Sequence, residues 1–331
     1  MEELLAGLKA IAEITRLRIL FALSHGEMNV TELTQVLQQS QPRVSRHLKL
    51  MADSGLISRH KEGNWVLFRL RQEGRGGALA RALVDMLPGH DNLLQEDLGR
   101  LETIRILRQK LASTYFAANA AQWQKLRSLH VQEPAVEQTL LSMLGSATYD
   151  LVLDLGTGTG RILELLAGRS KAAWGVDLSR DMLQVARANL ENAGLKNAQL
   201  RQADIYALPF ADQSADLISI HQVLHYLDDP QRALLEARRI LKPSGKMIIV
   251  DFAPHELEEL RTEHAHRRLG ISAEQMAGFL TRSGLTLNEH RVLEPPWVKT
   301  GTGLTVSLWL AELPTTHSQS TSTPFSKASA R

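Results

Sequence analysis

Cysteine is absent from this chain of 331 residues. Without it the protein has no disulfide bonds, no thiolate ligands for a metal and no cysteine nucleophile. No apolar run approaches the roughly 20 residues that span a bilayer. The amphipathic start of the chain, which opens with two glutamates, does not resemble a secretion signal. We therefore expect a cytoplasmic protein that does not associate with a membrane.

The chain also has little net charge, +2 with histidine neutral. That balance does not by itself indicate binding to nucleic acid. Hydrophobic residues make up 44% and charged residues 22%, which are ordinary values for a globular protein, and the length predicts two domains. Within residues 1–75, eleven Lys and Arg stand against eight Asp and Glu. The excess of positive charge is therefore local to the first part of the chain.

Residues 1–70 predict helices followed by a β-hairpin. Apolar residues recur at helical spacing as far as Leu23, and Gly26 ends the pattern. A short helix over Glu32–Gln38 is expected next, with Thr31 as its N-cap. A second helix is expected over Pro42–Asp53, because proline suits the first turn of a helix.

The helix Pro42–Asp53 has an apolar side formed by Val44, Leu48 and Met51. The remaining polar residues offer guanidinium, amide and hydroxyl groups to base edges and phosphates. The candidate DNA-binding residues are Gln41, Arg43, Ser45, Arg46, His47 and Lys49 of this helix, together with Lys61 of the hairpin. The hairpin joins strands over Leu56–His60 and Trp65–Leu70. Its turn, Lys61-Glu62-Gly63-Asn64, has basic flanks.

This helix-turn-helix and hairpin, with the sequence Ser-Gln-Pro-Arg-Val-Ser-Arg-His-Leu-Lys-Leu-Met followed by Gly-Leu-Ile and Glu-Gly, resembles the ArsR family of bacterial regulators. The resemblance covers about residues 5–87 and implies a winged helix that binds a double-stranded DNA operator as a homodimer. A helix over Ala78–Leu87, after a break containing Gly74, Gly76 and Gly77, would pack with the first helix across the two-fold axis. Many ArsR-like proteins sense metals through cysteines in the segment that matches Thr31–Gln39, which here offers no cluster of ligands, so we expect no metal sensing of that type and assign no metal ligands.

Asp91–His130 is expected to form one long helix or two consecutive helices with a stripe of leucines. Its end, Tyr115–Arg127, resembles the helices that cap the site of methyltransferases of the ubiquinone/menaquinone-biosynthesis type. The alternative is that Tyr115, Phe116 and Trp123 belong only to a core. A further helix is expected over Pro134–Leu144.

The stretch Leu151–Gly160 is an apolar run that ends in a carboxylate and three alternating glycines. It predicts a parallel strand that turns sharply into a helix, a place where open α/β proteins bind ligands. A dinucleotide-binding turn would need a glycine at position 161, where Arg161 stands. The pattern instead resembles motif I of the class I S-adenosylmethionine (SAM) methyltransferases. The resemblance implies that SAM contacts Asp154, Gly156, Gly158 and Gly160.

Later features follow in the order that this resemblance requires. The strand Ala172–Val176 ends at Asp177, a position from which a carboxylate can accept both ribose hydroxyls. Leu178 and Met182 then match a family motif that lies beside the adenosine. Asp204 would bind the adenine amino group and Ile205 would cover the ring. His221, after the strand Ala215–Ile220, matches the position that faces the reacting methyl group.

The C-terminal part is expected to be an α/β Rossmann-like domain with a seven-stranded sheet. A helix over Ala233–Leu241 precedes a fifth strand over Met247–Asp251. Antiparallel strands over Leu285–Val292 and Leu304–Leu310 complete the sheet. Ser244 stands where the family has a glycine. The expected division of the chain is residues 1–87 for the winged helix, 88–130 for a connector and cap, 131–311 for the methyltransferase domain and 312–331 for a disordered tail.

Three groups near the expected methyl position can act as acid or base or can only shape the pocket: His221, His225 and Tyr226. The cluster Glu263–Arg268, on a predicted helix, could hold an anionic acceptor or a metal, or could be a solvated helix face. The sequence Ser219–Gln222 differs from the motif of amino-group DNA methyltransferases, and arsenite methylation would need cysteine. We therefore expect the methyl acceptor to be a small molecule, and the sequence does not identify which one.

Two interpretations of the fusion follow. In the first, the protein is a transcription regulator whose methyltransferase domain senses SAM or its product S-adenosylhomocysteine (SAH). In the second, it is an active small-molecule methyltransferase whose winged helix autoregulates its operon. A third, in which the winged helix only mediates dimerisation, leaves Arg43, Arg46 and Lys49 without a role.

Overall fold

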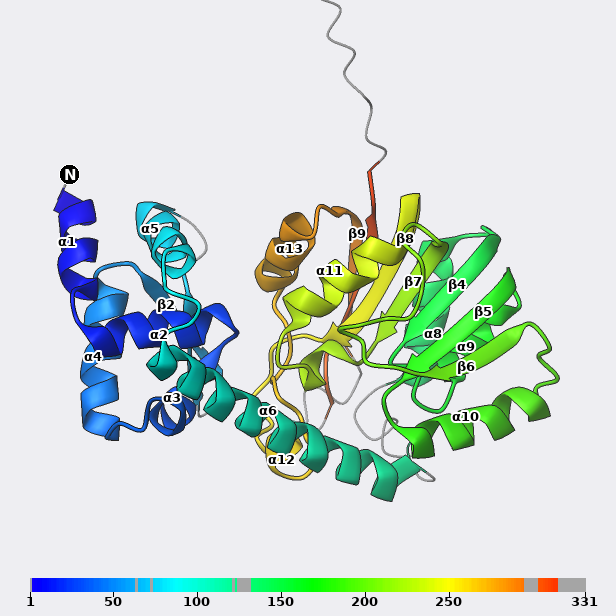
Figure 1. Cartoon of the computed structure of the whole chain (residues 1–331). Helices are drawn as coiled ribbons and strands as arrows, with labels where there is room; N and C mark the ends of the chain where they lie inside the picture. The colour runs from blue at the N-terminus through cyan, green and yellow to red at the C-terminus, as the bar shows by residue number, and fades with distance from the viewer. Residues whose placement is uncertain are drawn as a thin grey trace, which may run out of the picture.

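The computed structural model describes residues 2–62, 65–71, 74–120, 123, 132–294 and 303–314. The first part of the chain forms a helical region with a three-stranded sheet, and the last part forms a seven-stranded sheet flanked by helices. One long helix, α6 (Asn92–Asn119), runs from the first region to the second (Figure 1). This arrangement confirms the expected fold class, a winged helix-turn-helix followed by a Rossmann-like α/β domain. No helix among the described residues is long and apolar enough to cross a membrane.

The N-terminal region has the element order of a winged helix-turn-helix. Its elements are α1 (Glu2–Ile11), α2 (Ile14–Ser24), β1 (Met28–Asn29), α3 (Val30–Leu37), α4 (Gln41–Asp53), β2 (Ile57–Glu62), β3 (Trp65–Leu70) and α5 (Gly74–Asp85). The strands pair in the order β1-β3-β2 and all pairs are antiparallel. As expected, α4 buries Val44, Leu48 and Met51, because residues three and four apart share one face of a helix.

The helix before α4 begins earlier than the sequence indicated. We expected Thr31 as the N-cap, but the N-cap of α3 is Asn29. The Asn29 side chain accepts a hydrogen bond from the Glu32 backbone N–H (3.0 Å), and the Glu32 carboxylate accepts one from the Asn29 backbone N–H (3.1 Å). This capping box satisfies two donors that the helix end leaves unpaired, and it fixes the position of Glu32.

The glycines of the expected break at residues 74–77 belong to a helix instead. α5 begins at Gly74, so the helix expected over Ala78–Leu87 was placed too late. A Cβ atom on Gly76 would lie 2.2 Å from the backbone oxygen of Gly55. Glycine is therefore required because α5 packs closely on the turn after α4, and not because the chain loops there.

α6 is anchored on the winged-helix region by a buried ion pair. Arg18 of α2 donates two hydrogen bonds to the Asp97 carboxylate, at 2.6 and 2.7 Å, and the two side chains are 6% and 1% exposed. Arg100 adds a second cation at 2.7 Å from Asp97. Bidentate pairs of this kind fix geometry as well as adding energy, so the first half of α6 is tied to α2.

The rest of the expected helical segment Asp91–His130 is only partly described. Asp91 is the N-cap of α6, and residues 121, 122 and 124–131 lie outside the described residues. The expected apolar stripe is buried at Leu94 and Leu101. It ends before Leu107 and Leu111, which are 58% and 64% exposed. The second half of α6 therefore runs beside the methyltransferase region and is not enclosed by it (Figure 1).

The large sheet has the strand order β6-β5-β4-β7-β8-β10-β9. Its strands are β4 (Tyr149–Leu155), β5 (Ser170–Asp177), β6 (Ala198–Gln202), β7 (Ala215–His221), β8 (Leu241–Phe252), β9 (Thr286–Leu293) and β10 (Val306–Glu312). The pairs among the first five strands in that order are parallel, and β10 is antiparallel to both of its neighbours. The seven expected strands are therefore all present.

Helices cover both faces of this sheet. They are α8 (Glu133–Leu144), α9 (Arg161–Ala167), α10 (Arg180–Asn192), α11 (Pro230–Ile240), α12 (Glu259–Thr262) and α13 (Ala273–Arg282). Side chains of α8 and α9 share one buried cluster with Val152, whereas α11 and α13 share another with Leu153 and Leu155. Successive residues of a strand point to opposite faces. Both faces of the sheet are thus covered, and the carboxyl ends of its parallel strands are the place where a ligand can bind.

Two details at the C-terminal end concern the expectations from sequence. Ser244 has φ of 60°, in the left-handed region that favours glycine, which is the residue the family has at this place. β10 extends to Glu312, into the segment expected to be a tail, and residues 315–331 lie outside the described residues.

Candidate cofactor cavity and DNA-reading surface

The glycine-rich turn after β4 is held between two neighbouring strands. The backbone N–H groups of Gly156 and Thr157 donate to the Val176 carbonyl of β5, at 2.7 and 2.9 Å. Gly156 has φ of 72°, and a Cβ atom there would lie 2.4 Å from a methyl group of Val223. Only glycine fits this position. Asp154, at the end of β4, is buried and accepts a hydrogen bond from the Ser219 hydroxyl of β7.

Asp177 is oriented by the same turn. Its carboxylate accepts hydrogen bonds from the backbone N–H groups of Gly158 (2.9 Å) and Ser179 (2.8 Å). Burial raises the pKa of Asp177 above its ordinary value even though these backbone donors act in the opposite direction. A buried carboxylate in this state gains from further hydrogen-bond donors. The vicinal hydroxyls of a ribose fit that need.

A cavity of about 820 Å³ opens at this edge of the sheet. Small-molecule sites range from about 300 to 1,000 Å³, so this one has room for a nucleoside cofactor and a second ligand. The expected cofactor residues that line it are Asp154, Gly156, Gly158, Asp177, Leu178, Met182, Asp204, Ile205 and His221. Gly160 is not among the lining residues. It packs against α10 instead, since its Cβ would lie 3.1 Å from that of Ala186.

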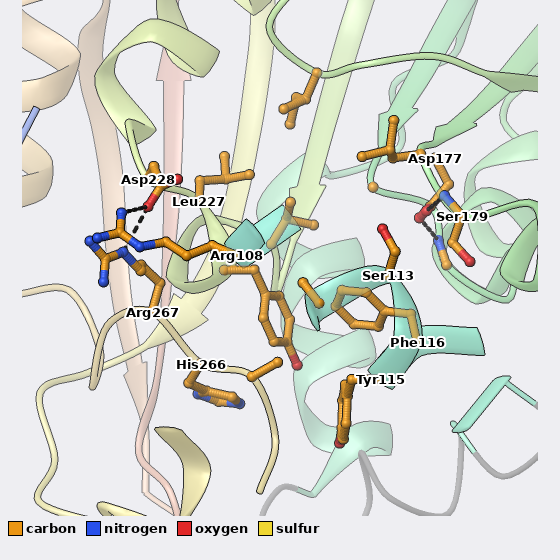
Figure 2. Close-up of a pocket in the computed structure, with 18 of the residues that line it drawn as sticks. Arg108, Ser113, Tyr115, Phe116, Asp177, Ser179, Leu227, Asp228, His266 and Arg267 are labelled. Atoms are coloured by element: carbon orange, nitrogen blue, oxygen red, sulfur yellow. Dashed lines mark hydrogen bonds and ion pairs between the residues drawn. The ribbon is translucent and has the colours of Figure 1, made fainter. Parts of the chain in front are cut away.

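Aromatic side chains from α6 form one wall of the cavity. Phe116 lies edge-on to Tyr226 with ring centroids 5.0 Å apart, and Tyr115 lies 5.7 Å from Phe116. Trp123 completes the group at 5.4 Å from Phe116. All four line the cavity. Figure 2 shows Tyr115 and Phe116 in this wall, and the assignment of Tyr115, Phe116 and Trp123 to a cap over a bound ligand stays a prediction.

The three candidate acid or base groups occupy different places. His221 is the last residue of β7, and both His221 and Tyr226 line the cavity. His225 does not line it, because its ring lies behind Tyr226, with the two centroids 4.0 Å apart. Its Nδ1 lies 2.7 Å from a carboxylate oxygen of Asp251, and both side chains are almost fully buried. Asp251 was predicted only as the last residue of a strand, and its pairing had no signal in the sequence.

The far wall of the cavity comes from the winged-helix region. Glu32 of α3 and Trp65 of β3 are lining residues, opposite the glycine turn. The Glu32 carboxylate lies 3.1 Å from the guanidinium of Arg267 and also pairs with Arg108 of α6. Both arginines bind Asp228, at 2.7 and 2.9 Å. Figure 2 shows Arg108, Asp228 and Arg267 together at one end of the cavity, with Asp177 at the other.

The electrostatics of this contact lower the pKa values of Asp228 and Glu27. Burial alone would raise the pKa of Asp228, but the charges of Arg267 and Arg108 outweigh it and hold the pKa below its ordinary value. Glu27 behaves in the same way: burial opposes ionisation, and Arg268, at 2.7 Å, is the main cause of a lowered pKa. The two regions therefore meet through charged pairs.

The cluster Glu263–Arg268 was expected on a helix, and this is wrong. α12 ends at Thr262, and the cluster follows it in an irregular segment. It is not a solvated face either, because His266 is 8% and Arg268 is 6% exposed. Its arginines bind carboxylates of the winged-helix region, and Arg261 just before it stacks 4.5 Å over the Trp65 ring. The cluster thus joins the two regions.

The expected DNA-reading residues lie on α4, except for Lys61, which lies on β2. Exposed side chains are those of Gln41, Arg43, Ser45, Arg46 and Lys49 on α4, and Lys61 on β2. His47 departs from the expectation of an outward side chain. It is 13% exposed and lies between Glu13 (4.0 Å) and Arg16 (3.5 Å), and burial lowers its pKa despite Glu13. In Figure 1, α4 lies at the edge of the molecule away from the large sheet.

Two family models match separate parts of the chain. The one described as "Bacterial regulatory protein, arsR family" matches residues 14–59, from α2 into β2. The one described as "Methyltransferase domain" matches residues 153–249, from β4 into β8. The second match contains the glycine turn, Asp177 and Asp204. The first match contains Glu32, another lining residue of the cavity, and neither match covers α6.

Curated relatives each match part of the chain. The chain is 30% identical over 166 residues to an uncharacterized 37.1 kDa protein in transposon TN4556 of Streptomyces fradiae, covering 46% of this chain and 48% of that protein. It is 35% identical over 113 residues to the ubiquinone/menaquinone biosynthesis C-methyltransferase UbiE of Klebsiella pneumoniae, covering 33% and 45%. The chain thus spans less than half the length of these curated relatives.

A solved structure shows the fold of the larger region. It is a chain from the complex of the Haloferax volcanii Trm112 methyltransferase activator with a methyltransferase, at 23% identity and a TM-score of 0.51, covering 60% of this chain and 98% of that one. The protein therefore joins an ArsR-family helix-turn-helix domain to a class I SAM-dependent methyltransferase domain.

Proposed function

We propose that this protein is a transcription regulator that binds an operator in double-stranded DNA and senses SAM or SAH, the state of the methyl cycle, in its methyltransferase domain. The observation that carries the proposal is the shared cavity wall: Glu32 and Trp65 of the winged-helix region line the same cavity as Gly156 and Asp177. A ligand shifts a conformational equilibrium only through different affinities for the two states. A cavity built from both domains provides such a difference, because moving the domains changes the cavity.

The contacts of Glu32 support a route from this cavity to the DNA-reading helix. Glu32 is part of the capping box of α3. α3 in turn shares a buried cluster with α4 through residues such as Val36 and Leu48. A displacement of Arg267 or Arg108 at the cavity therefore acts on the first helix of the helix-turn-helix motif.

The continuity of α6 supports the same coupling. Its N-terminal half is tied to α2 by the buried Arg18–Asp97 pair. Its C-terminal half places Tyr115 and Phe116 in the cavity wall. A continuous helix transmits a rotation along its length, so a change of the aromatic wall on ligand binding reaches the winged helix without an intervening loop.

The proposal includes a homodimer in the cytoplasm. α1 exposes Leu4, Leu5 and Leu8, each more than 40% exposed, on the surface that a second copy would cover. A two-fold dimer would set two α4 helices on successive major-groove turns. Sedimentation at micromolar concentration tests this part, and a monomer that binds a single half-site would contradict it.

The second candidate is an active small-molecule methyltransferase whose winged helix autoregulates its operon. His221 and Tyr226 in the cavity, with His225 behind them, favour it. The two candidates share the cofactor, SAM, which supplies an activated methyl group when bound, and they differ in whether a second molecule is methylated.

The test is a titration of the full chain onto DNA from its own promoter, at one fixed salt concentration, without ligand, with SAM and with SAH. A sensor shifts the DNA affinity by about tenfold or more, which is about 1.4 kcal/mol of coupling. Because coupling between two binding sites is reciprocal, the same DNA must change the affinity for SAM or SAH by the same factor. Identical curves in all three conditions would mean two independent modules and would refute the sensor.

A further inference from the structure

A smaller cavity of about 40 Å³ adjoins the cofactor cavity. The residues that line both are Tyr115, Trp123, Gln222, Tyr226 and His266. We call the smaller one the side chamber. Its described lining residues include no carboxylate and no lysine or arginine. A space of this size holds a hydroxyl group or a few water molecules, whereas the body of a ligand must stay in the larger cavity.

Gln222, at the junction of the two cavities, combines two unusual properties. Its φ of 55° is in the left-handed region, which is uncommon for a residue with a side chain. The side chain is 7% exposed, and its amide nitrogen has no hydrogen-bond partner among the described residues. Buried amide groups in folded proteins are almost always paired. Strain and an unpaired donor at one residue indicate a site for a ligand acceptor atom.

His225 contributes a second polar group to the side chamber. Its Nδ1 lies 2.7 Å from Asp251, which also accepts hydrogen bonds from the backbone N–H groups of His225 (3.3 Å) and Phe252 (2.8 Å). An Nδ1–H that donates to this carboxylate leaves the lone pair on Nε2. Nε2 is buried and has no partner within the described part of the chain. His225 is 1% exposed and lines the side chamber.

We propose that Gln222 and the His225–Asp251 pair form an acceptor subsite for O-methylation of a flat, uncharged hydroxyl compound. The acceptor O–H bond breaks and its proton passes to Nε2 of His225. The oxygen bonds to the methyl carbon, and the electron pair of the broken C–S bond stays on the sulfur of SAH. The Gln222 amide N–H donates to the acceptor oxygen, and Asp251 is the positioning residue that keeps the proton on Nδ1 and stabilises the imidazolium.

The walls of the cavities select the acceptor class. Phe116, Tyr226 and Tyr115 form edge-to-face aromatic contacts at the entrance of the side chamber, and His266 stacks on His225 with centroids 4.2 Å apart. Flat aromatic rings pack well in such surroundings. A group that is already charged would enter the side chamber at a large desolvation cost. A neutral hydroxyl avoids this cost, because it becomes negative only as His225 takes its proton and supplies the counter-charge, so an aromatic or enolic hydroxyl fits better than a carboxylate or an amine cation. This subsite rests on the proposed binding of SAM or SAH, but not on the response of DNA binding.

The test uses para-nitrophenol, a flat phenol whose ionised form absorbs visible light, titrated into the full chain saturated with SAH. At a pH below the pKa of free para-nitrophenol, where the unbound compound stays un-ionised, wild-type protein should bind it and show the absorption of the phenolate. His225→Gln should lose the phenolate absorption. Asp251→Asn should keep binding but require higher pH for the same phenolate fraction, a shift that a structural role would not produce. Gln222→Leu should weaken binding about tenfold, about 1.4 kcal/mol.

Two variants serve as controls: His290→Gln on β9 and Gln199→Leu on β6, neither of which lines a cavity. Both should match wild type. SAH affinity, measured separately by calorimetry, should stay within about twofold in every variant, which also reports that the variant is folded. Phenolate absorption that persists in His225→Gln, or a wild-type protein that binds SAH but not para-nitrophenol, would overturn the subsite. A wild-type protein that fails to bind SAH would refute the proposed function instead.

Discussion

The replacement Glu32→Gln tests the contact between the two domains with little disturbance of either. Glutamine is the other residue that completes a capping box, so α3 keeps its N-terminal hydrogen bonds to Asn29. What is lost is the negative charge that faces Arg267 and Arg108. Since the Glu32 side chain is only 10% exposed, solvent screens these interactions weakly.

The size of the effect follows from the remaining partners. Arg267 and Arg108 both keep Asp228, at 2.7 and 2.9 Å, so neither becomes an unpaired buried cation. The loss is therefore nearer to that of one charged hydrogen bond, about 1.5–3 kcal/mol, than to a broken buried ion pair, about 3–5 kcal/mol. A tenfold response to ligand needs only about 1.4 kcal/mol. The free energy lost on replacing Glu32 is therefore at least as large as the free energy of coupling between ligand binding and DNA binding.

We therefore expect Glu32→Gln to bind the operator and SAH separately but to lose most of the change in DNA affinity caused by ligand. The matched control is Glu96→Gln on α6, since Glu96 is 64% exposed and, within the described part of the chain, forms an ion pair with Arg100 of the same helix. Exposed pairs contribute about 0–1 kcal/mol, and the control should respond like wild type. A Glu32→Gln protein whose response stays within about twofold of wild type would refute the route through α3.

Three further predictions follow. Asp177→Ala removes the buried carboxylate expected to bind the ribose, and calorimetry should show SAM affinity at least about tenfold lower, with ligand-free DNA binding unchanged. Arg46→Ala should do the reverse, lowering DNA affinity and the salt dependence of binding while calorimetry shows wild-type SAM affinity. Glu27 and Asp228 have pKa values below the ordinary 4.5 and 3.8, so the stability they add is complete above those values and is lost as pH falls through the lowered pKa values. The temperature of thermal unfolding should therefore show no loss of this stabilisation between neutral pH and about pH 4.5, and should fall below about pH 3.8. An unfolding temperature that already falls near neutral pH would contradict the prediction.

Much of the cofactor cavity was predictable because its signals are local. The positive φ of Gly156, 72°, is a requirement of the turn itself, whose two ends are adjacent in the sequence. Asp177 follows a buried strand directly, and parallel strands bring their carboxyl ends to one edge. Apolar spacing likewise identified the buried side of α4. In each case the physical constraint acts within a few residues, so the sequence pattern carries it.

Errors arose where a distant segment decides the local structure. The glycines of α5 suggested a loop, but Gly76 is glycine because the backbone of Gly55 touches it. His47 looked like an outward residue of a reading helix, but Glu13 and Arg16 draw it against the start of α2. Composition could single out the segment Glu263–Arg268 as chemically unusual. It could not tell that its partners lie more than two hundred residues earlier, at Glu32 in α3 and at Glu27 just before β1.

The position of that segment bears on the choice between sensor and enzyme. The backbone N–H groups of Arg267 and Arg268 both donate to the His225 carbonyl, at 2.9 and 3.0 Å. The turn that carries His225 beside the side chamber therefore also holds the two arginines that bind Glu32 and Glu27. If the proposed coupling holds, a molecule that enters the side chamber acts on this turn and, through it, on the winged helix. By reciprocity, bound DNA would then alter the affinity for that molecule. Methyl transfer and DNA binding would then both depend on what occupies the cofactor cavity and the side chamber. An acceptor molecule should therefore change the operator affinity even when SAH is the bound cofactor in every measurement.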